Sequence, residues 1–113
     1  MTHSVSPREV FVYTTKEGRQ PYSDWLNGLR DGMTRRRIIQ RVTRLESGNY
    51  GDCKSLKDGV FELRLAFGSG YRIYFAEDGN TFVILLCGGD KSTQEKDIEG
   101  AKAYWKEYKN DKT

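Results

Sequence analysis

The sequence predicts an α+β domain in which helices cover one mainly antiparallel sheet. Two observations lead to this fold class. Residues 60–75 alternate apolar and polar side chains on both sides of a glycine-rich break, the pattern of two strands joined in a hairpin. Residues 22–29 and 34–47 instead repeat apolar side chains at helical spacing, which indicates a pair of helices packed on the sheet. The expected order of elements is β-α-α-β-β-β-α.

The length of 113 residues is enough for one modest core, so we expect a single domain over residues 1–113 with flexible ends at 1–7 and 110–113. No apolar run is long enough to span a bilayer, and the N-terminus has no apolar signal region. A cytoplasmic protein is therefore expected, without a membrane partner. In that compartment Cys53 and Cys87 would be reduced thiols.

The only histidine of the chain is His3, near the N-terminus. A zinc site of two cysteines and two histidines cannot form, and a Ser-His-Asp or Cys-His arrangement elsewhere in the chain is excluded. We therefore expect no metal and no cofactor, and any catalysis has to use Lys, Arg, Tyr, Asp or Glu. The formal net charge of +3 permits a nucleic-acid partner but does not require one.

The first half of the chain contributes one strand and two helices. Residues 8–15 are rich in β-branched and aromatic side chains and predict the first strand. Pro21 suits the first turn of the helix at 22–29, and Thr34 is expected to cap the second helix, which ends near Ser47 before a glycine. The apolar stripes of the two helices are Trp25, Leu26 and Leu29 in the first, and Ile38, Val42 and Leu45 in the second.

The central hairpin is expected to turn at residues 68–70. A three-residue loop sets Phe67 opposite Tyr71, and therefore Arg64 opposite Tyr74. Because side chains alternate between the faces, one face is apolar core and the other is a basic and aromatic platform. The apolar face comprises Phe61, Leu63, Leu65, Phe67, Ile73 and Phe75, and the platform comprises Glu62, Arg64, Arg72 and Tyr74. We expect the platform to face outward and to carry the function.

The remaining elements follow from local patterns. Residues 49–59 are polar and bounded by glycine, which predicts a loop. After a turn at 77–80, the apolar run 81–87 is typical of a strand buried on both faces. A capping box at 92–95 opens a last helix that ends near Tyr108. Its inward stripe is Ile98, Ala101 and Trp105.

The expected pairing of the last two strands brings a third basic residue to the platform. If Ala76 pairs with Thr81, Arg72 falls beside Leu85, and the chain leaves the last strand at the Arg72 end of the platform. Lys91 then lies near the two platform arginines.

Three strings of the sequence together carry a resemblance to a known family. They are residues 54–64 (KSLKDGVFELR), 70–75 (GYRIYF) and 85–94 (LLCGGDKSTQ). In this order and spacing they resemble the RelE/ParE superfamily of bacterial toxins, and more narrowly the addiction-module killer proteins of its HigB-like branch. The resemblance extends from the helix of Trp25 to the helix of Trp105.

The resemblance implies the toxin of a type II toxin–antitoxin module, neutralised by an antitoxin from the neighbouring gene, expected to be a small helix-turn-helix repressor. RelE-like members are endoribonucleases that cut mRNA on the ribosome and arrest growth. ParE-like members poison DNA gyrase on the same fold. A third alternative is a catalytically silent relative that only binds its antitoxin. Matched by motif, the catalytic residues that the resemblance implies are Arg64, Arg72 and Lys91.

The chain departs from the family pattern at one place. RelE-like members have a tyrosine near the start of the closing helix and HigB-like relatives a histidine, whereas this chain reads Glu-Lys-Asp-Ile at 95–98. The general base is therefore not assigned, and Tyr74, Lys91, Asp90 and Asp97 remain candidates.

RNA cleavage is chemically compatible with these residues. A 2′-hydroxyl can attack the adjacent phosphate without a metal, provided that the protein aligns the atoms, moves protons and stabilises negative charge. Arginine forks suit phosphate oxygens. Tyr71 and Tyr74 are expected to offer ring faces to an unstacked base. Lys54 and Lys57 are further candidates for substrate binding, although ordinary surface lysines are the simpler interpretation.

The positive charge of the chain is concentrated in its middle. Between Arg35 and Arg72 there are nine Lys and Arg against four Asp and Glu, whereas from Thr93 onward five lysines match five acids. Much of the excess lies on the second predicted helix, at Arg35, Arg36, Arg37, Arg41 and Arg44. This ridge is either a solvated helix face or a surface that attracts phosphates or an antitoxin.

Overall fold

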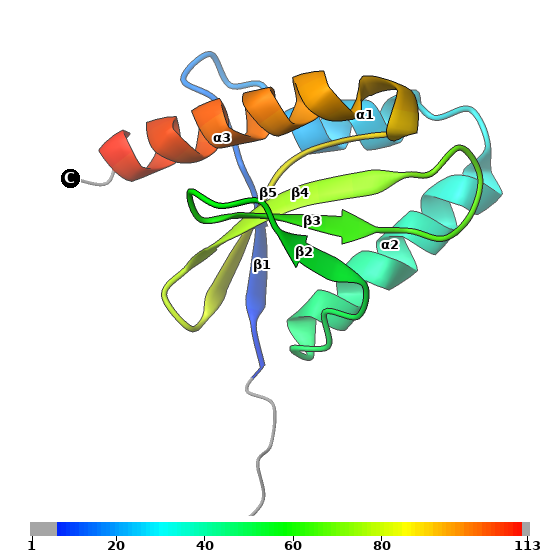
Figure 1. Cartoon of the computed structure of the whole chain (residues 1–113), viewed down its shortest axis with the longest axis horizontal. Helices are drawn as coiled ribbons and strands as arrows, with labels where there is room; N and C mark the ends of the chain where they lie inside the picture. The colour runs from blue at the N-terminus through cyan, green and yellow to red at the C-terminus, as the bar shows by residue number, and fades with distance from the viewer. Residues whose placement is uncertain (1–6, 112–113) are drawn as a thin grey trace, which may run out of the picture.

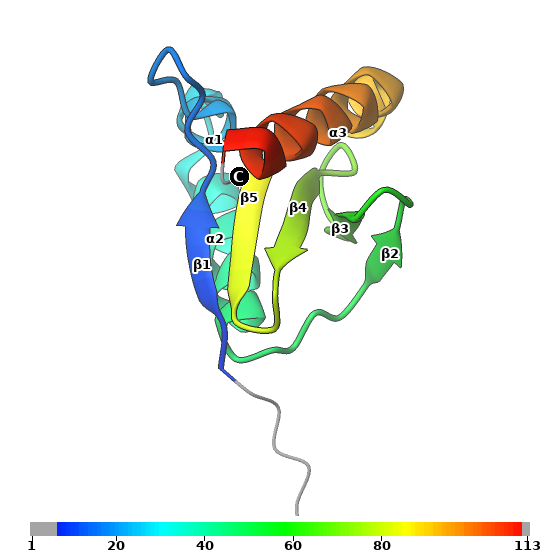
Figure 2. The same cartoon turned by 90° about the vertical axis from the view of Figure 1, so that its left-hand side faces the viewer.

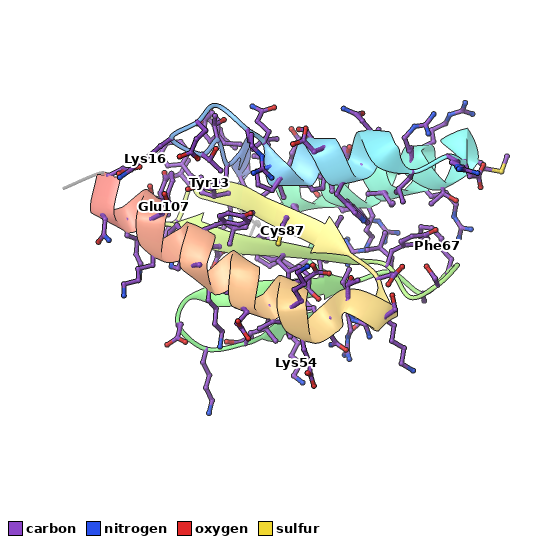
Figure 3. All side chains as sticks on the ribbon, turned by 90° about the horizontal axis from the view of Figure 1, so that it is seen from above. Tyr13, Lys16, Lys54, Phe67, Cys87 and Glu107 are labelled. Atoms are coloured by element: carbon purple, nitrogen blue, oxygen red, sulfur yellow. The ribbon has the colours of Figure 1, made fainter. Side chains whose placement is uncertain are left out.

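Five strands form one sheet between two layers of helix in the computed structural model, which describes residues 7–111. Helix α3 covers one face of the sheet, and α1 and α2 cover the other (Figures 1, 2 and 3). The elements in chain order are β1 Glu9–Val12, α1 Pro21–Gly28, α2 Gly32–Glu46, β2 Cys53–Ser55, β3 Val60–Arg64, β4 Arg72–Asp78, β5 Phe82–Gly89, the 3-10 turn η1 Lys91–Thr93, and α3 Gln94–Asp111. The predicted α+β class is confirmed.

The strands lie in the order β1-β5-β4-β3-β2. Only β1 and β5 are parallel, and the other three pairs are antiparallel, so the sheet is mainly antiparallel as predicted. The predicted order of elements lacked β2, a strand of three residues inside the expected loop at 49–59. A segment this short carries too few alternating side chains to be separated from a polar loop.

Each face of the sheet has its own core because β5 is buried on both sides. Val83 and Leu85 pack toward α1 and α2, whereas Ile84 and Leu86 pack toward α3. The prediction for the run 81–87 is therefore confirmed. The core under α3 also contains Tyr13, Val60, Tyr74, Ala76, Cys87, Ala101 and Trp105, and the core under α1 and α2 contains Tyr22, Ile38, Leu45, Leu63, Leu65, Ile73 and Phe75.

The predicted register of the hairpin is wrong by two residues. Arg64 lies opposite Arg72 instead of Tyr74. The loop is longer than expected. The hydrogen bond from Leu65 N to Tyr71 O, at 3.0 Å, closes a loop over residues 66–70, and within it Gly70 N donates to the carbonyl of Phe67 at 3.4 Å. A shift of two residues leaves every side chain on its predicted face, so the division into core and platform still holds.

The pairing of β4 with β5 also differs from the prediction. Arg72 lies beside Gly89 instead of Leu85, and Ala76 lies beside Ile84 instead of Thr81. A bulge between Tyr74 and Phe75 accommodates one extra residue of β5. The predicted position of the end of β5 is nonetheless correct, because β5 ends beside Arg72 of β4.

Two helix caps are not the predicted ones. Asp31, rather than Thr34, caps α2: its carboxylate accepts from Met33 N at 3.1 Å and from Thr34 Oγ1 at 2.8 Å. At the last helix the capping box is formed by Asp90 and Thr93 around η1, not by residues 92–95. In both cases an aspartate precedes the predicted cap, and the charged acceptor takes the free backbone donors.

The ends of the chain were only partly foreseen. Helix α3 continues to Asp111, so residues 110 and 111 are helical rather than a flexible tail. The predictions for residues 1–6 and 112–113 lie outside the described residues. Between residues 7 and 111, no helix has the length and apolar character needed to cross a membrane. Cys53 and Cys87 are free thiols, as expected, and burial beside Asp97 raises the pKa of Cys87 to about 12.

Gly88 sets how closely α1 approaches the sheet, and its replacement tests this contact. A Cβ at Gly88 would lie 2.2 Å from Cε3 of Trp25, a rigid ring. We expect Gly88→Ala to lower the free energy of unfolding by about 1–3 kcal/mol. As a matched control, Gly100 lies in α3 with open space around its Cβ position, and Gly100→Ala should raise that free energy by about 0.5–1 kcal/mol. Urea unfolding measures both; equal effects of the two variants would contradict this role of Gly88.

Candidate functional site

Arg64 and Arg72 face each other at the end of the central hairpin, as the last residue of β3 and the first of β4. Glu62 and Tyr74 form a directly opposed pair on the same face. Helix α3 covers that face, so Glu62 is 1% and Tyr74 0% exposed. The platform is therefore not the open surface that was predicted, and only the Arg64 end of it reaches solvent.

The carboxylate of Glu62 is the centre of a buried polar network. Its Oε2 accepts hydrogen bonds from Gln94 Nε2 at 2.9 Å and from Tyr74 Oη at 3.3 Å. The same oxygen lies 3.5 Å from Arg72 Nε, an ion pair in which the Arg72 side chain is 13% exposed. Glu62 thus links the hairpin to the first residue of α3. A buried carboxylate of this kind needs both the opposite charge and the hydrogen bonds to be tolerated.

Arg72 is held inward rather than pointing outward, which corrects the prediction. Its Nη1 donates to Gly70 O at 2.7 Å, while Nε faces Glu62 without hydrogen-bond geometry. The guanidinium is therefore fixed in orientation by two groups, and Nη2 is the nitrogen that none of these contacts occupies. A fork fixed in this way is preorganised for an anion that reaches its free edge.

Gly70 lies between Arg72 and Lys91. A Cβ built on Gly70 would be 3.3 Å from Arg72 Nη1 and 3.3 Å from Lys91 Cβ. The φ of Gly70 is +77°, so a side chain here is disfavoured by conformation as well as by space. The structure thus brings Lys91 to Arg72, with Lys91 exposed.

The turn that carries Lys91 is fixed by the preceding aspartate. Asp90 accepts from Ser92 N at 2.9 Å and from Ser92 Oγ at 2.6 Å, and Ser69 Oγ reaches its other oxygen at 3.5 Å. The hydrogen bonds from Ser92 hold the pKa of Asp90 below its usual value. Lys91 N donates to Ser69 O at 3.4 Å, which ties η1 to the tip of the hairpin.

Arg64, like Lys91, is an exposed member of the predicted trio, with 44% of its side chain accessible. Its Nη2 donates to Asp52 Oδ1 at 3.0 Å and its Nε to the same oxygen at 3.3 Å. Asp52 is itself exposed, so this ion pair contributes little to stability. An anionic ligand can therefore compete for the Arg64 guanidinium at small cost.

Three of the four predicted substrate-binding residues do not join this site. Tyr74 has no exposed ring face, and Tyr71 packs its ring against Trp25 and Phe67 on the opposite face of the sheet. Lys57 lies in the turn between β2 and β3, next to the end of β3 that is about 13 Å along the strand from Arg64.

Lys54 lies on the edge strand β2, on the side of the sheet that α3 covers (Figure 3). It pairs with Glu62, and its side chain is exposed. Of the four predicted substrate-binding residues, it is the one that shares a face with Arg64 and is accessible to a ligand.

A second basic feature lies on the other side of Arg64. An open groove of about 440 Å³ runs between α2 and the end of β3. Figure 3 shows Phe67 at this end of the sheet, beside α2. We call this feature the arginine groove; its lining comprises Arg37, Gln40, Arg41, Arg44, Gly51, Asp52, Arg64, Leu65, Ala66 and Phe67. The run of arginines was visible in the sequence, but their convergence with Arg64 was not.

Comparison with known proteins identifies the family. The family model described as phage-derived protein Gp49-like (DUF891) matches residues 24–109, which include every element from α2 to η1 and most of α1 and α3. The chain belongs to the Gp49-like family. It is also similar to a protein of Haemophilus influenzae (strain ATCC 51907 / DSM 11121 / KW20 / Rd), which carries the description "uncharacterized protein". The two are 51% identical over 81 residues, or 72% of this chain and 82% of the relative.

The Gp49-like family is consistent with the toxin of a toxin–antitoxin module, whose partner would be an antitoxin. The matched segment contains Arg64, Arg72 and Lys91 together with Glu62 and Gln94. The candidate site therefore lies wholly within the part of the chain that defines the family.

Three of the four candidates for a general base are poorly suited in this Gp49-like chain. Burial raises the pKa of Tyr74, and the charges of Glu62 and Asp97 raise it further, so a phenolate is disfavoured. The carboxylate of Asp90 is engaged by Ser92, and that of Asp97 accepts from Thr93 Oγ1 at 2.5 Å while lying against Gly89. Lys91 remains as the exposed candidate. Among residues 7–111 no group of three or more His, Cys, Asp and Glu is placed to hold a metal ion.

The buried network and the exposed ion pair should differ sharply in their contributions to stability. Glu62→Ala leaves Arg72 without its counter-charge in a covered site, so we expect the free energy of unfolding to fall by about 3–5 kcal/mol. Arg64→Ala, its matched control on the same strand, should cost at most about 1 kcal/mol. Urea unfolding of both variants measures the difference, and similar losses would show that Glu62 is not the centre of the network.

Proposed function

We propose that this Gp49-like chain is a toxin of the RelE/ParE superfamily, acting as a single domain in the cytoplasm. In this proposal it cleaves mRNA on the ribosome as the toxin of a type II toxin–antitoxin module. The observation that carries the proposal is the convergence of three basic residues at one end of the sheet: Arg72 lies opposite Arg64 and near Lys91 across Gly70. The Gp49-like family supports the coarser part, a toxin neutralised by an antitoxin.

The reaction in this proposal needs charge stabilisation more than an enzyme nucleophile. The 2′-hydroxyl gives its proton to a general base, for which Lys91 is the remaining candidate in this site, and its oxygen bonds to the adjacent phosphorus. The bond from phosphorus to the 5′-oxygen of the next nucleotide then breaks, and that oxygen takes up a proton from the protonated base or from water. The products are a 2′,3′-cyclic phosphate and a 5′-hydroxyl. Arg72 and Lys91 contact the phosphate oxygens, which carry extra negative charge in the transition state.

In this proposal cleavage depends on the ribosome, because the site has no carboxylate or phenol suited to act as general base. The residues around Gly70 supply positive charge, but no carboxylate or phenol among them is free to accept the proton of the 2′-hydroxyl. Alignment of the attacking oxygen with the leaving oxygen contributes several kcal/mol to such a reaction. In this proposal the ribosome holds the mRNA in that alignment, so free RNA is a poor substrate.

The antitoxin in this proposal is a small protein that covers the basic end of the sheet with acidic side chains. Electrostatic complementarity of this kind favours fast and selective association. An antitoxin that covers Arg64 and Lys91 would also block access of a phosphate to Arg72, because Arg72 lies opposite Arg64 in the hairpin and near Lys91 across Gly70.

Two observations favour a second candidate function. Arg72 is paired with Glu62 and largely covered, and the start of α3 has no tyrosine or histidine. A chain with this site could act by binding alone, either as a ParE-like inhibitor of DNA gyrase or as a silent relative that only pairs with its antitoxin.

Primer extension on cellular transcripts after induced expression tests the proposal. The wild-type chain should give discrete, codon-linked cuts and stop colony formation. Lys91→Ala removes one charge contact and should reduce cleavage roughly 10²–10³-fold. Arg72→Lys keeps a charge beside Glu62, which preserves the fold, but lacks the planar fork and should also fail substantially.

Arg36→Ala is the control, because Arg36 is exposed on α2 and does not line the arginine groove. It should cleave like the wild type. Thermal melts confirm that the variants are folded. Intact transcripts with induction of the DNA-damage response would instead support gyrase inhibition, and intact transcripts with normal growth would support the silent relative.

A further inference from the structure

The arginine groove has more positive charge than its own residues neutralise. Four arginines line it, and Asp52 is the single acidic residue among the lining side chains. Asp52 is already paired with Arg64, so Arg37, Arg41 and Arg44 face the groove without a carboxylate partner in its lining. The formal charge of this one groove equals the +3 of the whole chain.

Arg41 shows that the groove is short of an anion. Its Nη2 donates to the backbone carbonyl of Tyr50, whereas Nη1 is buried and has no hydrogen-bond partner among residues 7–111. Burial and the charge of Arg44 lower the pKa of Arg41. A buried guanidinium nitrogen without an acceptor is costly, and the groove lining supplies no carboxylate to balance its charge.

The arginines are arranged in a row. Arg37, Arg41 and Arg44 are spaced i, i+4 and i+7 on α2, so they share one face of the helix and follow one another at intervals of about 5 Å along its axis. Arg64 closes the groove from β3. A row of charges suits a ligand with several anionic groups in sequence better than it suits a single small anion.

The wall of the arginine groove opposite α2 favours RNA over an acidic peptide as the ligand. Leu65 is buried, and the ring of Phe67 is covered by the Arg37 guanidinium at 4.0 Å from its centroid. The apolar residues of the lining offer little open surface to an acidic peptide, because Leu65 is buried and Arg37 covers the ring of Phe67. Stacked Arg37 and Phe67 instead form a flat face of the kind on which an unstacked base or ribose can lie.

We propose that the arginine groove binds the sugar-phosphate backbone of single-stranded RNA, with Arg37, Arg41 and Arg44 contacting successive phosphates. The choice of RNA as the ligand rests on the proposed function. Arg64 borders both the groove and the candidate site, so one RNA strand can run through the groove and place its next phosphate beside Arg72. The groove then supplies affinity for RNA, and it takes no part in the chemistry.

Fluorescence anisotropy with a short labelled 2′-O-methyl RNA tests this proposal, because that RNA can bind but cannot be cleaved through its 2′-oxygen. Arg37→Gln and Arg44→Gln should each weaken binding by roughly three- to tenfold. Each should also reduce the slope of log K against log salt by about 0.7. Arg41→Gln should do the same, but it also removes the contact to Tyr50. If Arg41→Gln fails to fold, the variants of Arg37 and Arg44 still test the proposal.

Arg36→Gln is the matched control: it removes the same charge from the same helix but outside the groove. It should leave the affinity within twofold of the wild type. The proposal is overturned if all these variants weaken binding equally, if none does, or if a polyglutamate peptide binds the wild type more tightly than the RNA and with the same dependence on Arg44.

The outcome is separable from that of the proposed function. The 2′-O-methyl RNA reports binding without cleavage, so the affinity of the groove variants is measured independently of the cuts in cellular transcripts. If the groove variants lose RNA binding while transcripts stay intact in cells, the groove is real and the endoribonuclease proposal fails. If cleavage occurs and the groove variants bind normally, the endoribonuclease proposal stands and the groove fails.

Discussion

The burial of the Glu62 carboxylate under α3 is the constraint on which the candidate site depends. A negative charge at 1% exposure is tolerated only with compensation, and three groups provide it: Arg72, Tyr74 and Gln94. These groups come from β4 and from the first residue of α3. The requirement of one carboxylate therefore fixes the start of α3 relative to the hairpin and turns the Arg72 guanidinium toward Gly70.

Two consecutive glycines let both helical layers meet the same end of β5. Gly88 admits the ring of Trp25 on one face, and Gly89 admits Asp97 on the other, where a Cβ would lie 1.8 Å from Oδ2. Helices on both sides therefore reach the end of the sheet at which Arg72 and Lys91 converge. The two glycines have no side chains that could take part in chemistry, but they determine how closely the helices on both faces approach this end of the sheet.

The sequence was sufficient for properties that depend on periodicity, and insufficient for those that depend on distant partners. Strand alternation predicted that Arg64, Arg72, Glu62 and Tyr74 share a face, and this survived a register error of two residues because the period is two. The register itself depends on the turn at Phe67, which local composition did not reveal. The burial of Tyr74 could not be read from its own strand, since α3 covers it. The ion pair of Arg64 with Asp52 could not be predicted either, because Asp52 directly precedes β2, the strand that the sequence did not reveal.

The two basic features differ in how their charge is balanced, and this difference suggests a division of labour. Arg72 is neutralised by a buried carboxylate and held in one orientation, so it adds little to long-range attraction but offers a fixed fork. Arg37 and Arg44 are exposed and have no acidic partner in the groove, so their charges raise the local potential. Arg64, held only by the exposed Asp52, lies between the two. A polyanion drawn to the groove would thus reach Arg72 through the residue whose own ion pair is easiest to displace.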